Sequence, residues 1–262
     1  MSTLPLDEHR LHLWYARPNE ITDPALLDEY RDLLSPGELQ QQARFKFDKD
    51  RHQYLVSRAL VRTALSAYTG KEPGSWEFLL NAFGKPMLAG NSPMPLEFNL
   101  SHTPGLVTCL VALGHEVGVD TEDVTRQVDY LPLARRFFAA GEIAVLEGLP
   151  PEQQPAAFFR LWTLKEAYTK ACGLGLSIPL EDFAFRLAAD RPPEISFADR
   201  AGDDPDCWQF AEVGLGGRYQ VALAVRAPAA EPFSWTAWEA VPLGDPPRGG
   251  QLEPNPARRW EI

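Results

Sequence analysis

The chain has 262 residues, of which 45% are hydrophobic and 23% are charged, proportions typical of a globular protein rather than a disordered or fibrous one. Its 25 basic and 36 acidic residues leave a net charge of −11, which repels the phosphate backbone of nucleic acids. The longest apolar runs are far shorter than the roughly 20 residues needed to cross a bilayer. Asp7, Glu8 and Arg10 interrupt the apolar stretch that a signal peptide requires. We therefore expect a cytoplasmic protein that binds neither nucleic acid nor membrane.

The pattern of residues 1–115 predicts an N-terminal α/β half. Apolar residues over 50–68 recur at helical spacing and end before Gly70, which indicates a long core helix. Residues 107–113 are rich in β-formers and are typical of a buried strand. The other elements expected here are strands over 10–16, 76–81 and 96–100 and helices over 24–34 and from 35 onward.

Residues 116–228 repeat this order in outline and predict a C-terminal α/β half. A second long helix over 156–172 again precedes a strand, over 219–225, although any α/β chain of this size offers such coincidences about as often. The other elements expected are strands over 117–122, 180–187 and 208–213 and helices over 130–138 and from 142 onward. Seven prolines between positions 228 and 256 predict an irregular tail over 229–262, with one short strand near 234–240.

Two carboxylates lie in the strand expected over 117–122. Side chains alternate along a strand, so Asp120 and Glu122 project to the same side. Such a pair repels unless a cation lies between the two groups. Acidic pairs at strand ends are common, so metal binding and a plain acidic strand end are both open at this point.

The helix over 156–172 carries a third carboxylate. Trp162, Glu166 and Lys170 are successive i, i+4 neighbours on one stripe, which by itself indicates no more than one stabilising Glu–Lys pair. The helix is apolar over much of its circumference, however, so its charged residues need partners. Glu166 beside the first two carboxylates would complete a set of hard oxygen ligands suited to Mg²⁺, and the flanking lysines would suit phosphates.

Four motifs in this order resemble the Sfp type of 4′-phosphopantetheinyl transferase: Gly84-Lys85-Pro86, Asn99-Leu100-Ser101-His102, the strand 117–122, and Trp162-x-x-Lys165-Glu166-Ala167-x-x-Lys170. The resemblance covers about residues 35–180. It implies a pseudo-dimeric α/β (α+β) fold of two similar halves with the active site between them. It also implies transfer of the 4′-phosphopantetheine group from coenzyme A to a serine of an apo carrier protein, releasing adenosine 3′,5′-bisphosphate.

The resemblance also implies residue roles. Asp120, Glu122 and Glu166 correspond to the family's ligands for Mg²⁺, with Mn²⁺ as the alternative ion. Glu166 is the first choice for the base that accepts the serine proton, directly or through a water, and Glu122 is the second. Lys170 would neutralise phosphate charge during transfer. The expected contacts to coenzyme A are Arg44, Lys85, Pro86, Ser101, His102, Lys165 and Lys170.

One segment departs from the family pattern. Members often carry lysines after the Ser-Pro at 35–36 that reach the adenosine phosphates, whereas this chain has Glu38 and Gln41. Arg44 is the basic residue left there, and Arg51 or Arg58 on the next helix are the candidates that would compensate.

The expected partners are acyl, peptidyl or aryl carrier proteins of fatty acid, polyketide or nonribosomal peptide biosynthesis, and the enzyme is expected to be a monomer with broad carrier acceptance. Two alternatives stay open from sequence. A catalytically silent module would bind coenzyme A or a carrier without transfer, and a metal-dependent phosphoesterase would cleave coenzyme A without an acceptor.

Overall fold

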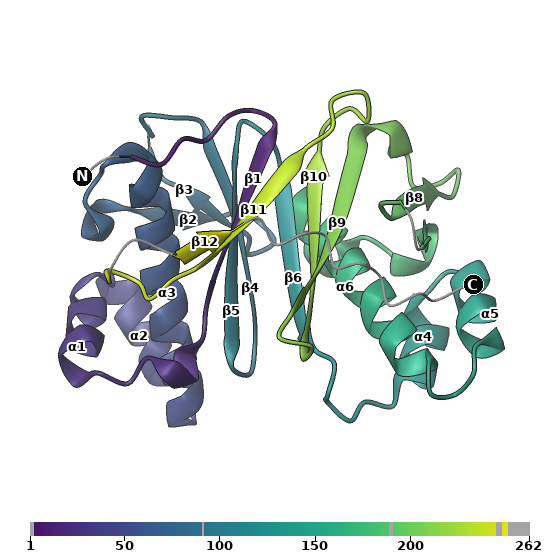
Figure 1. Cartoon of the computed structure of the whole chain (residues 1–262), viewed down its shortest axis with the longest axis horizontal. Coiled ribbons are helices and arrows are strands. Elements are labelled where there is room, and N and C mark those ends of the chain that lie inside the picture. The colour runs from purple at the N-terminus through teal and green to yellow at the C-terminus, as the bar shows by residue number, and fades with distance from the viewer. Residues whose placement is uncertain (1–2, 91, 189–190, 245–247, 251–262) are drawn as a thin grey trace.

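Two sheets stand face to face in the centre of the molecule, and helices cover the outer side of each (Figure 1). The structure is a computed structural model that describes residues 3–90, 92–188, 191–244 and 248–250. Within these ranges, no helix is long and apolar enough to cross a membrane.

The N-terminal half is built on a five-stranded sheet in the order β12-β11-β1-β5-β4. Its elements are β1 (Arg10–Ala16), α1 (Pro24–Asp32), α2 (Pro36–Arg44), α3 (Asp48–Thr69), the hairpin β2 (Phe78–Leu80) and β3 (Pro86–Leu88), β4 (Leu96–Thr103) and β5 (Leu106–Leu113). α3 packs its apolar face on this sheet, where Trp14 and Leu60 are fully buried. Because α3 buries one face, its apolar residues recur at helical spacing, and this spacing over 50–68 predicted the helix.

The C-terminal half is built on the antiparallel sheet β6-β10-β9. Its elements are β6 (Val117–Asp123), α4 (Tyr130–Phe137), α5 (Ala140–Gly148), α6 (Gln154–Cys172), the hairpin β7 (Phe183–Arg186) and β8 (Glu194–Phe197), β9 (Trp208–Leu215) and β10 (Tyr219–Arg226). α6 takes the place that α3 has in the first half, and Gly173 ends it in the left-handed conformation. The repeat seen in sequence therefore corresponds to two α+β halves.

The C-terminal segment returns to the first sheet. β11 (Ser234–Glu239) pairs in parallel with β1, and β12 (Arg248–Gly250) pairs with β11. The strand expected near 234–240 is present, but it is part of the five-stranded sheet rather than an element of an irregular tail. Residues 251–262, the rest of the expected tail, lie outside the described residues.

A third apolar cluster fills the space between the two sheets. It includes Leu13 and Leu110 of the first sheet and Val119 and Val221 of the second, and all four are fully buried. Burial of this kind contributes roughly 1.5–3 kcal/mol for each large aliphatic side chain. The two halves therefore share one core, which fixes β4 beside β6.

Candidate active site

Close backbone packing brings β4, β6 and α6 together. A Cβ atom added at Gly118 on β6 would lie 2.0 Å from the carbonyl oxygen of Ala167 and 2.4 Å from the amide nitrogen of Ala171 on α6. Only glycine permits this approach of a strand to a helix. It places the side chains at 120 and 122 next to the inner face of α6.

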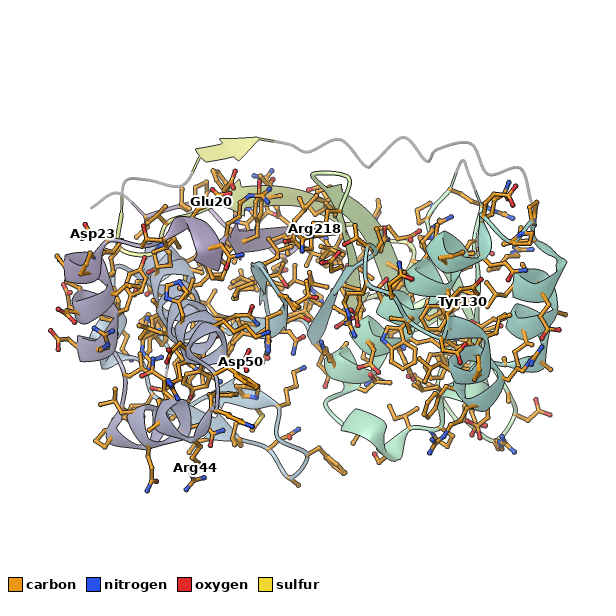
Figure 2. The ribbon with its side chains drawn as sticks, turned by 90° about the horizontal axis from the view of Figure 1, so that it is seen from below. Glu20, Asp23, Arg44, Asp50, Tyr130 and Arg218 are labelled. Carbon is orange, nitrogen blue, oxygen red and sulfur yellow. The ribbon has the colours of Figure 1, made fainter. Side chains whose placement is uncertain are left out.

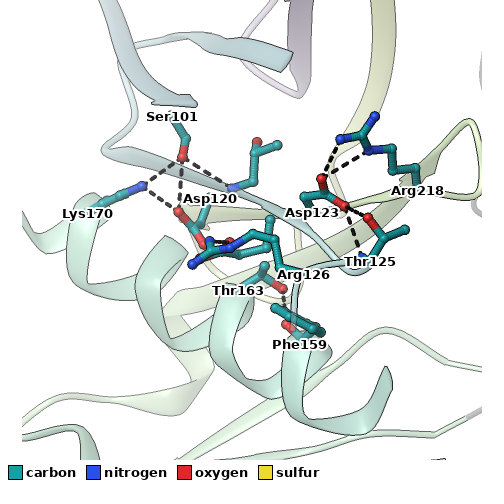
Figure 3. A network of polar contacts seen from close by, with 11 residues as sticks. Ser101, Asp120, Asp123, Thr125, Arg126, Phe159, Thr163, Lys170 and Arg218 are labelled. Atoms are coloured by element: carbon teal, nitrogen blue, oxygen red, sulfur yellow. Dashed lines mark hydrogen bonds and ion pairs between the residues drawn. The ribbon is translucent and has the colours of Figure 1, made fainter. Parts of the chain in front are cut away.

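Asp120, Ser101 and Lys170 form a hydrogen-bonded network at this junction (Figure 3). Lys170 Nζ lies 2.5 Å from Asp120 Oδ1 and 2.9 Å from Ser101 Oγ. Ser101 Oγ donates to Asp120 Oδ1 at 3.0 Å and accepts the amide N–H of Thr121 at 3.2 Å. Three elements from both halves thereby meet at one carboxylate.

The second oxygen of Asp120 has no partner. Asp120 is 5% exposed, and its Oδ2 is buried without a hydrogen-bond donor among the described residues. A buried polar atom left unpaired costs about 1–3 kcal/mol, and more when it is charged. This oxygen therefore favours a bound cation, and hard oxygen donors of this kind fit Mg²⁺.

Glu122 and Glu166 face the same space as Asp120. Burial raises the pKa of each, and the negative charge of Asp120 raises both further. Arg126 partly offsets this for Glu122, whose Oε2 accepts a hydrogen bond from the guanidinium at 2.8 Å. Mutual repulsion among three carboxylates is what a divalent cation relieves, so the residue set fits such an ion.

The three carboxylates are not arranged as a complete set of ligands. Across the described ranges, no group of three or more His, Cys, Asp or Glu side chains has the geometry to hold a metal ion. Lys170 pairs with Oδ1 of Asp120, and Arg126 pairs with Oε2 of Glu122. Each of these cations holds one carboxylate oxygen, and Oδ2 of Asp120 remains without a partner among the described residues.

His102 lies on β4 beside Ser101, and its side chain is exposed. The protein around the ring removes enough water to lower the pKa of His102, and the positive charges of Lys170 and Arg58 lower it further. An anion bound beside the ring would raise this pKa again, so His102 can gain a proton when a negative group is present.

Lys85 ties the two halves together. Its ammonium donates to the carbonyl oxygens of Ala171 at 2.9 Å and Val117 at 3.2 Å, and burial lowers its pKa. Asn81 adds a hydrogen bond from the same hairpin to the carbonyl of Gly173 at 2.7 Å. Pro86 begins β3 directly after Lys85. The structure thus places Lys85 at the junction, where its ammonium donates hydrogen bonds to backbone carbonyl oxygens.

Lys165 is not at this junction, contrary to the expectation from sequence. It is fully buried, pairs with Glu142 at 2.8 Å, and donates to the carbonyl oxygens of Leu180 and Phe183. All three donors of the ammonium are therefore used inside the second half. Lys165 points about 100° around α6 from its neighbour Glu166, which explains the different surroundings.

Arg44 is also away from the junction. It is exposed at the end of α2, and Figure 2 places it at the outer edge of the N-terminal half. Among the described residues its side chain makes one hydrogen bond, a long contact of 3.5 Å to Gln41.

Sequence reasoning assigned no role to Arg126 or Glu142, which act as the partners of Glu122 and Lys165. Glu122 lies on β6 and Arg126 follows in a turn, so the i, i+4 rule for helices does not predict this pair. Glu142 accepts a hydrogen bond from the backbone N–H of Phe185, which lies 43 residues further along the chain. No local sequence pattern reveals such a contact.

Two family models match the chain in succession. The N-terminal domain of 4′-phosphopantetheinyl transferase matches residues 24–114, and the 4′-phosphopantetheinyl transferase superfamily matches residues 116–224. The boundary between the matches coincides with the passage from the first sheet to the second. Together they describe a fold of two phosphopantetheinyl transferase halves, as the sequence predicted.

Individual relatives agree with these matches. The 4′-phosphopantetheinyl transferase HetI of a Nostoc species is 33% identical over 89% of this chain and 94% of its own length. The transferase Sfp of Bacillus subtilis is 30% identical over 66% of this chain and 75% of its own. The chain therefore belongs to the 4′-phosphopantetheinyl transferase family, and its activity is the transfer of 4′-phosphopantetheine from coenzyme A to carrier proteins.

Solved structures are similar to part of the chain. A holo-(acyl-carrier-protein) synthase from Bacillus anthracis, determined in complex with coenzyme A (3′,5′-ADP), covers 42% of this chain and 93% of its own, with 20% identity and a TM-score of 0.36. The holo-[acyl-carrier-protein] synthase of Thermotoga maritima covers 43% of this chain and 63% of its own, with 22% identity and a TM-score of 0.35.

Proposed function

We propose that the transfer depends on Mg²⁺ held by Asp120, Glu122 and Glu166, and that the enzyme is a monomer that accepts several kinds of carrier protein. The observation that supports the ion site best is the buried, unpartnered Oδ2 of Asp120 beside two carboxylates whose pKa values are raised. When bound, the ion supplies charge neutralisation for the pyrophosphate of coenzyme A.

The chain's own residues account for the remaining steps. The serine oxygen of the carrier forms a bond to the phosphorus next to pantetheine, and the bond from that phosphorus to the bridging oxygen breaks, which releases adenosine 3′,5′-bisphosphate. Lys170, 30% exposed and held by Asp120 and Ser101, offers its ammonium to phosphate oxygens from a fixed position. Positioning of this kind accounts for much of the catalysis of phosphoryl transfer.

Glu166 is the proposed base. Burial and the charge of Asp120 raise its pKa from 4.5, toward the range in which a carboxylate accepts a proton effectively. Glu122 is less suited, because its Oε2 already accepts a hydrogen bond from Arg126. The serine proton goes to Glu166, directly or through a water.

The test is intact mass spectrometry of an apo acyl carrier protein after incubation with the enzyme, coenzyme A and Mg²⁺. We expect a mass increase of one phosphopantetheine, which is absent with EDTA and with Asp120→Ala. Glu116→Gln is the matched control, since this exposed carboxylate pairs with exposed Arg226 away from the network. Transfer that persists in EDTA would contradict the Mg²⁺ dependence.

Further outcomes test the range of carriers, the alternative functions and the oligomeric state. Peptidyl and aryl carriers in the same assay should also gain the group, and modification of a single carrier type would contradict broad acceptance. Loss of coenzyme A without any modified carrier would indicate a phosphoesterase. Binding of coenzyme A with neither product would indicate a silent module. A solution mass of two chains would contradict the monomer.

A further inference from the structure

The two sheets meet at their edge strands, β4 and β6. β4 ends the five-stranded sheet and pairs with β5, whereas β6 ends the three-stranded sheet and pairs with β10. The two edge strands lie against each other, but within the described ranges no backbone ladder joins them (Figure 1). The N–H and C=O groups of a buried edge need other partners. At this edge, side chains supply them.

Side chains of the first half pair with backbone groups of β6 at every second residue, where an antiparallel strand directs its groups to one side. Asn99 Oδ1 accepts the amide N–H of Val119 at 2.9 Å, and Ser101 Oγ accepts the amide N–H of Thr121 at 3.2 Å. Two residues before Val119, the ammonium of Lys85 donates to the backbone carbonyl oxygen at 3.2 Å. The edge of β6 is thus held by three side chains in succession.

Asn99 is the member of this series that has no other task. Ser101 also contacts Asp120 and Lys170, so it belongs to the network of the active site (Figure 3). Among the described residues, Asn99 makes no hydrogen bond to either of them, and its side chain is 4% exposed. A backbone N–H only donates, so the side-chain oxygen of Asn99 must be the atom that faces β6.

Asp120 lies between the two amides that are held. Val119 and Thr121 flank it in the chain, so the two hydrogen bonds fix the backbone on both sides of Asp120. Val119 is fully buried, and without the oxygen of Asn99 its N–H would be left unpaired. Such a group is costly, so the backbone would shift toward another acceptor. The carboxylate of the next residue would shift with it.

We propose that Asn99 is a positioning residue for the transfer, which holds β6 in the register that presents Asp120 to Lys170. Asn99 acts through the backbone of Val119 and does not touch the substrate. Phosphoryl transfer depends on exact positioning of charged groups, so a small displacement of this pair lowers the rate. The inference rests on the proposed function, since it uses the role assigned there to Asp120.

The first test measures kcat and KM in the wild type, Asn99→Leu and Asn99→Asp. Leucine has a similar size but no acceptor, so kcat per folded molecule should fall about tenfold to a hundredfold, with KM for coenzyme A nearly unchanged. Aspartate keeps an acceptor oxygen in both protonation states, so Asn99→Asp should recover most of kcat.

Thr163→Val is the matched control for the loss of a buried hydrogen bond. Thr163 is fully buried on α6, and its hydroxyl donates to the carbonyl oxygen of Phe159 at 2.8 Å. This variant removes a hydrogen bond from the same core without touching β6, and kcat should stay at the wild-type value.

Hydrogen exchange at the amide of Val119 gives a readout that does not depend on activity. In the wild type this amide should be protected as well as those that pair β6 with β10. In Asn99→Leu it should exchange at least about tenfold faster, while Thr163→Val leaves it protected. An unprotected Val119 amide in the wild type would overturn the proposal, whether or not any variant folds.

The kinetic results can overturn the proposal independently. Wild-type kcat in Asn99→Leu would do so, and so would an Asn99→Asp variant as slow as Asn99→Leu, because the acceptor would then not matter. Asn99→Ala repeats the comparison if Asn99→Leu does not fold. Transfer by the wild type in EDTA would contradict the ion site alone, and the amide exchange together with kcat would still decide the role of Asn99.

Discussion

Two lysines five residues apart on α6 form the same kind of ion pair in opposite environments. Lys165 pairs with Glu142 inside the second half, and two carbonyl oxygens satisfy the rest of its ammonium. Lys170 pairs with Asp120 at the junction of the halves, where it is 30% exposed and one carboxylate oxygen stays unpartnered. The first pair is complete and stabilises the fold. The second is incomplete, which is the condition for binding something else.

The largest effect is expected at the incomplete pair. Asp120→Asn should lower kcat/KM by at least about a thousandfold, since it removes a proposed ion ligand and the partner of Lys170. The melting temperature should change little, because the loss of the ion pair with Lys170 is offset by removal of a buried negative charge that repels Glu122 and Glu166. Steady-state transfer assays and calorimetry measure the two effects. A large loss of stability would show that this pair is structural after all.

The complete pair should behave in the opposite way. Lys165→Met leaves the carboxylate of Glu142 buried without its cation, which costs about 3–5 kcal/mol of unfolding free energy. Activity per folded molecule should change little. Urea denaturation gives the stability, and the double variant with Glu142→Gln should recover part of it because the buried charge is gone. If Lys165→Met abolished transfer at full stability, Lys165 would act on the substrate.

The contact that joins the two regions can be tested at Gly118. Gly118→Ala forces its new Cβ against the backbone of α6 and should cost about 1–3 kcal/mol or more, with a loss of activity as Asp120 moves. Gly141→Ala is the control, since nothing lies near its Cβ position on helix α5. Equal stability of the two variants in denaturant would show that β6 and α6 have room to separate.

The smallest effect is a dependence on pH. The folded-state pKa of Glu166 is raised, so the folded protein holds this proton more tightly than the unfolded chain does. Stability therefore falls as pH rises from about 4.5, the ordinary pKa of a glutamate, through the raised pKa of Glu166. The melting temperature of wild type relative to Glu166→Gln should fall across this window without Mg²⁺ and fall less with it. A difference that rises with pH would contradict the sign.

The sequence predicted those parts of the site that depend on local geometry. Alternation along a strand placed Asp120 and Glu122 on one side, and helical spacing placed Glu166 and Lys170 on one stripe. The sequence did not show where Lys165 lies, because α6 is apolar nearly all round and its residue pattern does not tell which polar side chains face the junction. The direction of Lys165 is set by its ion pair with Glu142, which lies on another helix.

The fold shows the same division. Hydrophobic spacing predicted the long core helices and the two halves. It did not predict that β11 pairs with β1 in the first sheet. Ser234 lies opposite Arg10 across more than 200 residues of chain, and the parallel pairing of two strands so far apart leaves no periodic signal.

The late position of β11 also sets an order of assembly. During synthesis, β1 emerges early but lacks its parallel neighbour until Ser234–Glu239 has left the ribosome, long after β6, α6 and β10 are available. The half that comes second in the chain is thus the first whose sheet can be completed. Until then β1 presents an open edge, and pairing across such sequence separation is slow. A nascent or truncated chain ending before residue 234 consequently exposes this edge to aggregation.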